Sequence, residues 1–221
     1  MLAGLYAALA VASSATAARR SRAGAWATKP LLMPVLVAFT LAAAGDRGKD
    51  MRLPAAGMAA SGLGDIALLG PDSWFLPGMG AFAAAHACYI AALAGDGAAG
   101  RVRPRAAAGY AALWAVLIAV LWRRLGSLRV PVAAYSLLLV SMAILASGRN
   151  RAAAAGGALF VVSDALIACG LAGIRAVPRQ ESAIMPAYAA AQFLLAAGYL
   201  RPRREAGSAP AAVPPGPGGH P

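Results

Sequence analysis

Apolar runs of membrane-spanning length fill most of this sequence and restrict its fold more than any other feature. A helix needs ~20 apolar residues to cross the hydrocarbon of a bilayer, with a range of about 17–25. Arg, Lys, Asp, Gly or Pro separates successive runs, and the gaps are too short for a soluble domain. The sequence therefore predicts an all-α, polytopic membrane helix bundle of about eight transmembrane helices. We expect these helices at residues 2–18, 26–45, 53–70, 75–95, 106–122, 130–147, 152–174 and 182–200.

Composition and charge agree with a membrane protein. Hydrophobic residues make up 60% of the chain and charged residues 13%, whereas soluble domains carry roughly 25% charged residues. The net charge of +12 would suit a nucleic-acid binder, but the arginines fall between the apolar runs and not along one helix face. Cationic loops between membrane spans explain that pattern better. We expect membrane lipids and no nucleic acid as partners. The abundant Ala, Gly, Arg and Pro suggest a GC-rich genome, hence a bacterial inner (plasma) membrane.

The two ends of the chain raise separate questions. Residues 1–200 form the expected bundle, while 201–221 are basic and then rich in Pro and Gly, which is typical of a disordered tail. The first run could be a signal peptide, with "ATA" before a cleavage point. However, no positive charge precedes that run, and Arg19, Arg20 and Arg22 follow it, which opposes translocation of the next segment. We therefore expect a retained helix. Positive charge is nearly balanced between the two sides and only slightly favours cytoplasmic termini.

A few polar side chains lie inside the apolar runs. A carboxylate at the centre of a membrane helix costs at least about 2.5 kcal/mol, so such residues are usually functional. The ionisable residues within the runs are Lys29, Asp65, His86 and Asp164, and Tyr89, Tyr188 and Gln192 add further polar groups.

Alternation of helix direction places these groups at one level. The second, fourth and eighth runs start on the side away from the termini, and the third and seventh end there, so all seven residues fall in the same half of the bilayer. His86 and Tyr89 are three residues apart, and Tyr188 and Gln192 four apart, so each pair shares a helix face. We expect six of these side chains to line one cavity: Lys29, Asp65, His86, Asp164, Tyr188 and Gln192.

The residue types restrict the chemistry of such a cavity. Catalytic zinc usually has three protein ligands, mostly His or Cys, and only one histidine lies in the runs. The sequence shows no Ser-His-Asp order and no Gly-rich phosphate loop. The remaining possibility is acid–base chemistry by a carboxyl pair, in which one acid stays protonated and the other ionised. We therefore expect no metal and no cofactor.

Five short motifs then occur in a distinctive order. They are "TKPLLMP" (28–34), "GLGDIALL" (62–69), "FLPGMGAFAAAHACYI" (75–90), "GALFVVSDALIA" (157–168) and "MPAYAAAQFLL" (185–195). In this order they resemble the YhhN-like lysoplasmalogenase family. The resemblance implies a membrane hydrolase of eight helices. Such an enzyme cleaves the vinyl ether of a lysoplasmalogen to a fatty aldehyde and a glycerophospho-alcohol.

The resemblance and the polar residues together suggest roles. Asp65 and Asp164 are the expected catalytic acids, and the sequence does not say which of them donates the proton that vinyl ether hydrolysis requires. Lys29 or His86 is the expected contact for the substrate phosphate, and Lys29 is the better placed. The other expected substrate-binding residues are Tyr89, Tyr188 and Gln192.

Two other functions use the same residues. "GLGD" matches the GxGD signature of intramembrane aspartyl proteases, although Asp164 lies downstream of it, whereas that family has its other aspartate upstream. A proton-coupled membrane carrier could also use two membrane aspartates as a relay. It would be marked by broken helices and inverted repeats, and the sequence shows no clear repeat.

Overall fold

Eight α-helices make up the bundle in the part of the chain that the structure describes. The computed structural model describes residues 1–201, without the side chains of Arg47, Lys49 and Glu181. Within that part, the all-α prediction is confirmed and the helices agree with the predicted runs to within a few residues. The predicted tail lies almost wholly outside the described residues. The helices are α1 (Leu2–Ala18), α2 (Arg22–Ala44), α3 (Arg52–Ala67), α4 (Phe75–Gly95), α5 (Pro104–Leu121), α6 (Arg129–Arg149), α7 (Arg151–Leu171) and α8 (Gln180–Leu200).

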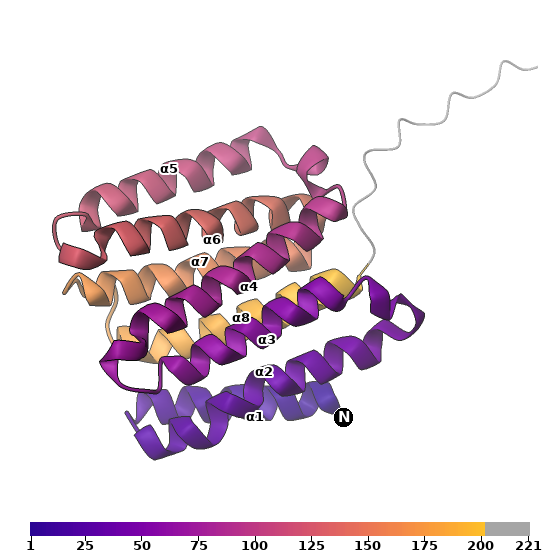
Figure 1. Cartoon of the computed structure of the whole chain (residues 1–221), viewed down its shortest axis with the longest axis horizontal. Helices are drawn as coiled ribbons and strands as arrows, with labels where there is room; N and C mark the ends of the chain where they lie inside the picture. Colours follow the sequence, from indigo (N-terminus) through magenta and orange to yellow (C-terminus); the bar gives the residue numbers. More distant parts are fainter. Residues whose placement is uncertain (202–221) are drawn as a thin grey trace, which may run out of the picture.

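The helices run back and forth through the bundle, joined by short turns (Figure 1). The amino terminus and the end of α8 lie at the same end, which we call the terminal end. The opposite, distal end holds the turns at residues 19–21, 68–74, 122–128 and 172–179. Helix α8 packs against α7, α1 and α2, and α4 packs against α3 and α6. Helix α5 packs mainly against α6 and forms one edge of the bundle.

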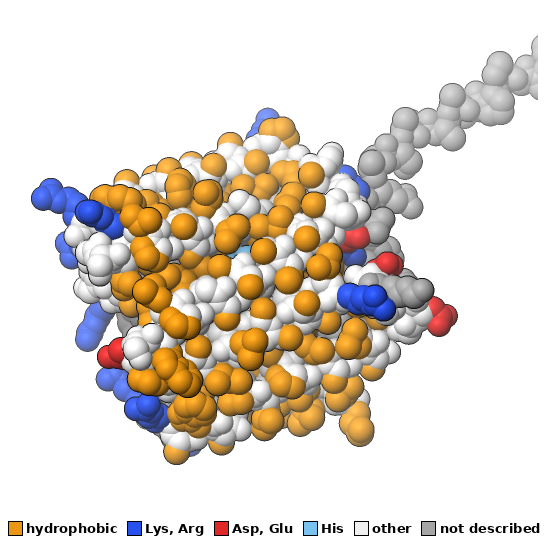
Figure 2. Space-filling model, viewed as in Figure 1, with side chains coloured by type: hydrophobic (Ala, Val, Ile, Leu, Met, Phe, Trp, Pro, Cys, Tyr) orange, Lys and Arg blue, Asp and Glu red, His pale blue; other side chains and the backbone are white. Residues whose placement is uncertain are grey.

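The surface is that of a membrane protein. Apolar side chains cover the face between the two ends, and lysines and arginines gather mostly at the ends (Figure 2). Six helices of the described chain are long and apolar enough to cross a membrane: α2, α4, α5, α6, α7 and α8. Helix α1 is apolar but has 17 residues, and α3 has 16. Two shorter helices therefore accompany six full spans.

Small residues bring α7 and α8 into close contact. A Cβ added to Gly156 would lie 2.8 Å from the Leu195 backbone nitrogen, and one added to Gly198 would lie 2.7 Å from that of Ala153. Only glycine allows this approach, as is common where membrane helices pack closely. The contact fixes the two helices that carry Asp164 and Tyr188 relative to each other.

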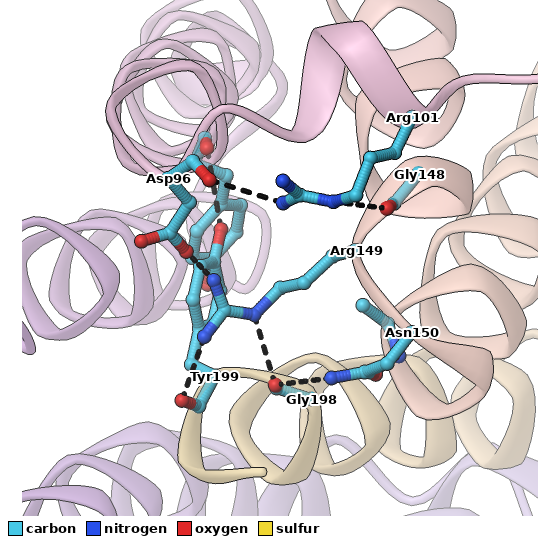
Figure 3. Close-up of polar contacts among 9 residues, drawn as sticks. Asp96, Arg101, Gly148, Arg149, Asn150, Gly198 and Tyr199 are labelled. Atoms are coloured by element: carbon cyan, nitrogen blue, oxygen red, sulfur yellow. Dashed lines mark hydrogen bonds and ion pairs between the residues drawn. The ribbon is translucent and has the colours of Figure 1, made fainter. Parts of the chain in front are cut away.

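A polar cluster holds the terminal end of α8 (Figure 3). Arg149, which is 4% exposed, forms an ion pair with Asp96. Its Nε donates a hydrogen bond to the Gly198 carbonyl (2.9 Å), and its Nη2 donates to the Tyr199 carbonyl (2.9 Å). The last carbonyls of a helix have no partner within the helix, so Arg149 stabilises the end of α8 and ties it to α4.

The neighbours of Arg149 extend this cluster. Asn150 donates from Nδ2 to the Gly198 carbonyl (2.8 Å), and its Oδ1 accepts from the Ala153 amide (3.0 Å), which caps α7. Arg101 donates to backbone oxygens of Asp96 (3.0 Å) and of Gly148 (3.2 Å). The ends of α4, α6, α7 and α8 are thus joined at the end opposite the candidate site.

Candidate active site

A cavity of about 120 Å³ lies among α2 to α8, between the midplane and the distal end. Its polar lining includes Lys29, Asp65, Tyr135, Asp164 and Tyr188, and most of its wall is apolar. One water needs roughly 10–15 Å³ of such volume, so the cavity has room for water beside a reacting group. The two aspartates therefore share one cavity.

Asp65 is held by a cation and a tyrosine. It lies near the end of α3 and is 2% exposed. Lys29 of α2 places its Nζ 3.4 Å from Oδ1, and the Tyr188 hydroxyl of α8 donates to Oδ2 at 2.7 Å. Both carboxylate oxygens thus have a partner, and one of the partners neutralises the charge.

Asp164 has a different environment. The Tyr135 hydroxyl of α6 donates to its Oδ2, and His86 Nε2 of α4 lies 3.2 Å from that hydroxyl. Because Tyr135 donates to the carboxyl group, the hydrogen between His86 and Tyr135 belongs to the imidazole. In the described part of the chain, no Lys or Arg lies within ion-pairing distance of Asp164. Asp65 is therefore paired with a cation, whereas Asp164 is contacted only by a hydroxyl group.

A second hydrogen-bonded row lies behind Asp65. The Tyr89 hydroxyl donates to Gln192 Oε1 (2.8 Å), and Gln192 Nε2 donates to the Tyr188 hydroxyl (3.3 Å). The Tyr199 hydroxyl donates to the Tyr89 carbonyl (3.2 Å). These hydrogen bonds connect the Arg149 cluster at the end of α8 with the Tyr188 hydroxyl that contacts Asp65. The position of α8 therefore controls the contact between Tyr188 and Asp65.

The structure brings the expected site residues into two connected groups. Lys29, Asp65, Asp164 and Tyr188 line the cavity. His86, Tyr89 and Gln192 are 0% exposed and lie behind the lining. His86 contacts Tyr135 and Gln192 contacts Tyr188, both of which line the cavity, and Tyr89 bonds to Gln192. The expectation that six residues line one cavity is therefore wrong for His86 and Gln192, because their polar atoms face neighbouring helices. Lys29, the expected contact for the substrate phosphate, forms an ion pair with Asp65.

Tyr135 is the site residue that sequence reasoning missed. It lies in α6, which carries none of the five motifs. It joins His86 to Asp164 and lines the cavity. The sequence feature that could have identified Tyr135 is its position within an apolar run, at the same depth as the other polar groups.

The described residues contain no group of three or more His, Cys, Asp and Glu side chains arranged to hold a metal ion. The site therefore consists of two carboxyl groups, one amine, one imidazole, tyrosine hydroxyls and an amide. Such groups can donate and accept protons, as general acid–base catalysis requires.

Comparison with known proteins identifies the family. The model of the YhhN family matches residues 24–199, which include every residue of the site. Proteins named lysoplasmalogenase from Mycobacterium bovis and Mycobacterium tuberculosis are each 34% identical over 181 residues, covering 76% of this chain and 67% of the relative. Human lysoplasmalogenase TMEM86B is 31% identical over 156 residues, covering 65% of this chain and 62% of its own. No solved structure matches. This integral membrane protein therefore belongs to the YhhN family.

Proposed function

We propose that this chain hydrolyses the vinyl ether of lysoplasmalogens, and that Asp164 is the proton donor and Asp65 the base. The family and the relatives named lysoplasmalogenase support the reaction. The observation that carries the mechanism is the unequal environment of two carboxyl groups in one cavity. The protein acts in the bacterial inner membrane, where its lipid substrate lies.

Charge balance indicates which of the two carboxyl groups is ionised and which is protonated. Lys29 neutralises an ionised Asp65. A second ionised carboxyl group in the same cavity would have no cation, and an uncompensated charge in an apolar interior costs several kcal/mol. Asp164 therefore carries a proton before the reaction. Tyr135 donates to its Oδ2, which leaves Oδ1 to hold that proton and deliver it.

The first chemical step is proton transfer to carbon. Asp164 gives its proton to the β-carbon of the vinyl ether, and the electrons of the double bond form the new C–H bond. The ether oxygen and the α-carbon then share the positive charge of an oxocarbenium ion. The ionised Asp164 and Asp65 stabilise this cation in the cavity, where low polarity strengthens the attraction.

Hydration and collapse complete the cycle. Water attacks the cationic carbon and gives a proton to Asp65, which forms a neutral hemiacetal. The bond between that carbon and the glycerol oxygen then breaks. Asp65 returns its proton to the leaving glycerol oxygen, and Asp164 takes the proton of the hemiacetal hydroxyl. The products are a fatty aldehyde and a glycerophospho-alcohol, and both acids regain their starting states.

Product analysis in heavy water tests this proposal. Protein purified in detergent is incubated in D₂O with an alkenyl lysophosphatidylethanolamine, and the aldehyde is examined by mass spectrometry. We expect one deuterium on the carbon beside the aldehyde group, because that carbon takes its new hydrogen from Asp164. The matching acyl lysolipid serves as control and should remain intact. If folded protein releases no aldehyde from alkenyl lysolipids with several headgroups, the proposed activity is wrong.

A further inference from the structure

A second recess opens at the distal end of the bundle. It has a volume of about 960 Å³ and lies between the turn after α1, the end of α7 and the loop that leads into α8. Three arginines line it, Arg20, Arg175 and Arg179, together with the polar residues Gln180 and Ser182. No acidic side chain is among the described residues that line it. We call this space the basic recess.

The basic recess adjoins the candidate active site. Ile167, Leu171 and Ile184 line both spaces. Ile167 and Leu171 follow Asp164 by one and two turns of α7, and with a rise of about 1.5 Å per residue, Leu171 lies roughly 10 Å along the helix from Asp164. A molecule that extends past these three residues would contact both the arginines and the carboxyl groups.

Backbone conformation marks two of the arginines. Arg20 and Arg179 both have φ of 52°, and they are the non-glycine residues with positive φ in the described part of the chain. Glycine usually occupies such left-handed positions, since a side chain makes this backbone conformation unfavourable. At both places the chain keeps a long cationic side chain, and both side chains line the recess.

The cavity itself lacks a suitable contact for phosphate. Its lysine, Lys29, is in an ion pair with Asp65, and no other Lys or Arg is among the described residues that line it. The guanidinium group, in contrast, presents donors in a planar fork that matches the oxygens of a phosphate. The cations suited to a lipid headgroup are therefore those of the recess.

We propose that the basic recess binds the phosphate of the lysolipid substrate, an inference that rests on the proposed function. In a lysoplasmalogen, one glycerol backbone separates the phosphate from the vinyl ether. With its phosphate at Arg175 and Arg179, the glycerol passes the wall shared by the two spaces, and the vinyl ether reaches Asp164. The hydrocarbon chain then follows the apolar part of the cavity. The first turn of α8 adds backbone N–H groups, which favour an anion.

A pair of substrates tests this site. One is an alkenyl lysophosphatidylethanolamine, and the other is the alkenylglycerol of the same chain length, which lacks the phosphate. We expect wild-type protein in neutral detergent to prefer the phosphorylated substrate. The variant with Arg175→Gln and Arg179→Gln should lower kcat/KM for that substrate roughly 10- to 100-fold, mainly through KM, since contacts to charged groups are worth that much. Hydrolysis of the alkenylglycerol should be unchanged.

The control variant carries Arg123→Gln and Arg124→Gln. These exposed arginines lie in the turn between α5 and α6, also at the distal end, and do not line the recess. They should leave both substrates unaffected, whereas Arg179→Lys should retain part of the preference.

Each other outcome overturns the proposal. Equal losses for both substrates, equal losses in the control variant, or a wild type that does not prefer phosphate would each exclude a phosphate site in the recess. A loss that appears only when anionic lipid is added would assign the arginines to membrane lipids. If the wild-type protein cleaves neither substrate, the proposed function is wrong, and so is the phosphate site that rests on it.

Discussion

The change Tyr135→Phe removes one hydroxyl group that contacts both Asp164 and His86. A hydrogen bond between neutral groups contributes about 1 kcal/mol, and one to a charged group contributes about 1.5–3 kcal/mol. In the proposed mechanism Asp164 is neutral when substrate binds and negative after it has given up its proton. The contact therefore strengthens by about 1–2 kcal/mol during the reaction. Only interactions that strengthen in this way accelerate the chemical step.

The expected result is a kcat lowered roughly 5- to 30-fold, at about 1.36 kcal/mol per factor of ten, with KM changed little. Initial rates of aldehyde release over a range of lysoplasmalogen concentrations measure both constants. Tyr110→Phe is the matched control, because Tyr110 is partly buried against the same hydrophobic core but does not line the cavity. An unchanged kcat in Tyr135→Phe would mean that Asp164 does not become charged in the rate-limiting step.

Three further changes test other parts of the structure. Lys29→Met removes the cation that keeps Asp65 ionised, so kcat should fall by roughly 10²-fold or more, whereas a phosphate contact would mainly raise KM. Tyr188→Phe should reduce kcat by less than Tyr135→Phe does, because its contact to Asp65 weakens when Asp65 takes a proton from water; a larger effect would reverse the assignment of the two acids. Arg149→Ala breaks a buried ion pair at the end of α8, which costs about 3 kcal/mol. At about 2–4 °C per kcal/mol, thermal unfolding in detergent should shift down by roughly 6–12 °C, and an unchanged melting temperature would contradict this role.

The helices could be predicted from sequence because a bilayer imposes one simple requirement, a long apolar run for each span. The depth of the site followed from the same reasoning. Once the helices alternate in direction, the positions of Asp65 and Asp164 along α3 and α7 place both carboxyl groups in the distal half of the bundle.

Side-chain partners could not be predicted in this way. A polar residue in a membrane helix can face a cavity or a neighbouring helix, and helix spacing does not distinguish the two. Tyr89 of α4 forms a hydrogen bond with Gln192 of α8, and Lys29 of α2 forms an ion pair with Asp65 of α3. These choices depend on the rotation of packed helices, which close contacts at small residues influence, such as Gly57 of α3 against Tyr89 and Gly62 of α3 against Met33.

Arg149 and Asp96 show a second limit of sequence reasoning. Each lies where a span ends, a place where charged residues are ordinarily solvated and carry no specific signal. The structure buries Arg149 against the last carbonyls of α8. Only the arrangement of four helix ends reveals that this arginine differs from the exposed ones at the same end.

The central claim is that two carboxyl groups with opposite protonation states cleave one vinyl ether. The most direct measurement compares single-turnover aldehyde release by wild type, Asp164→Asn and Asp65→Asn, each shown to be folded by its melting temperature and elution volume in detergent. We expect both variants to react roughly 10²- to 10⁴-fold more slowly, because an amide can neither deliver the proton nor accept one from water. A folded variant of either residue that reacts within a few-fold of wild type would contradict the two-carboxyl mechanism.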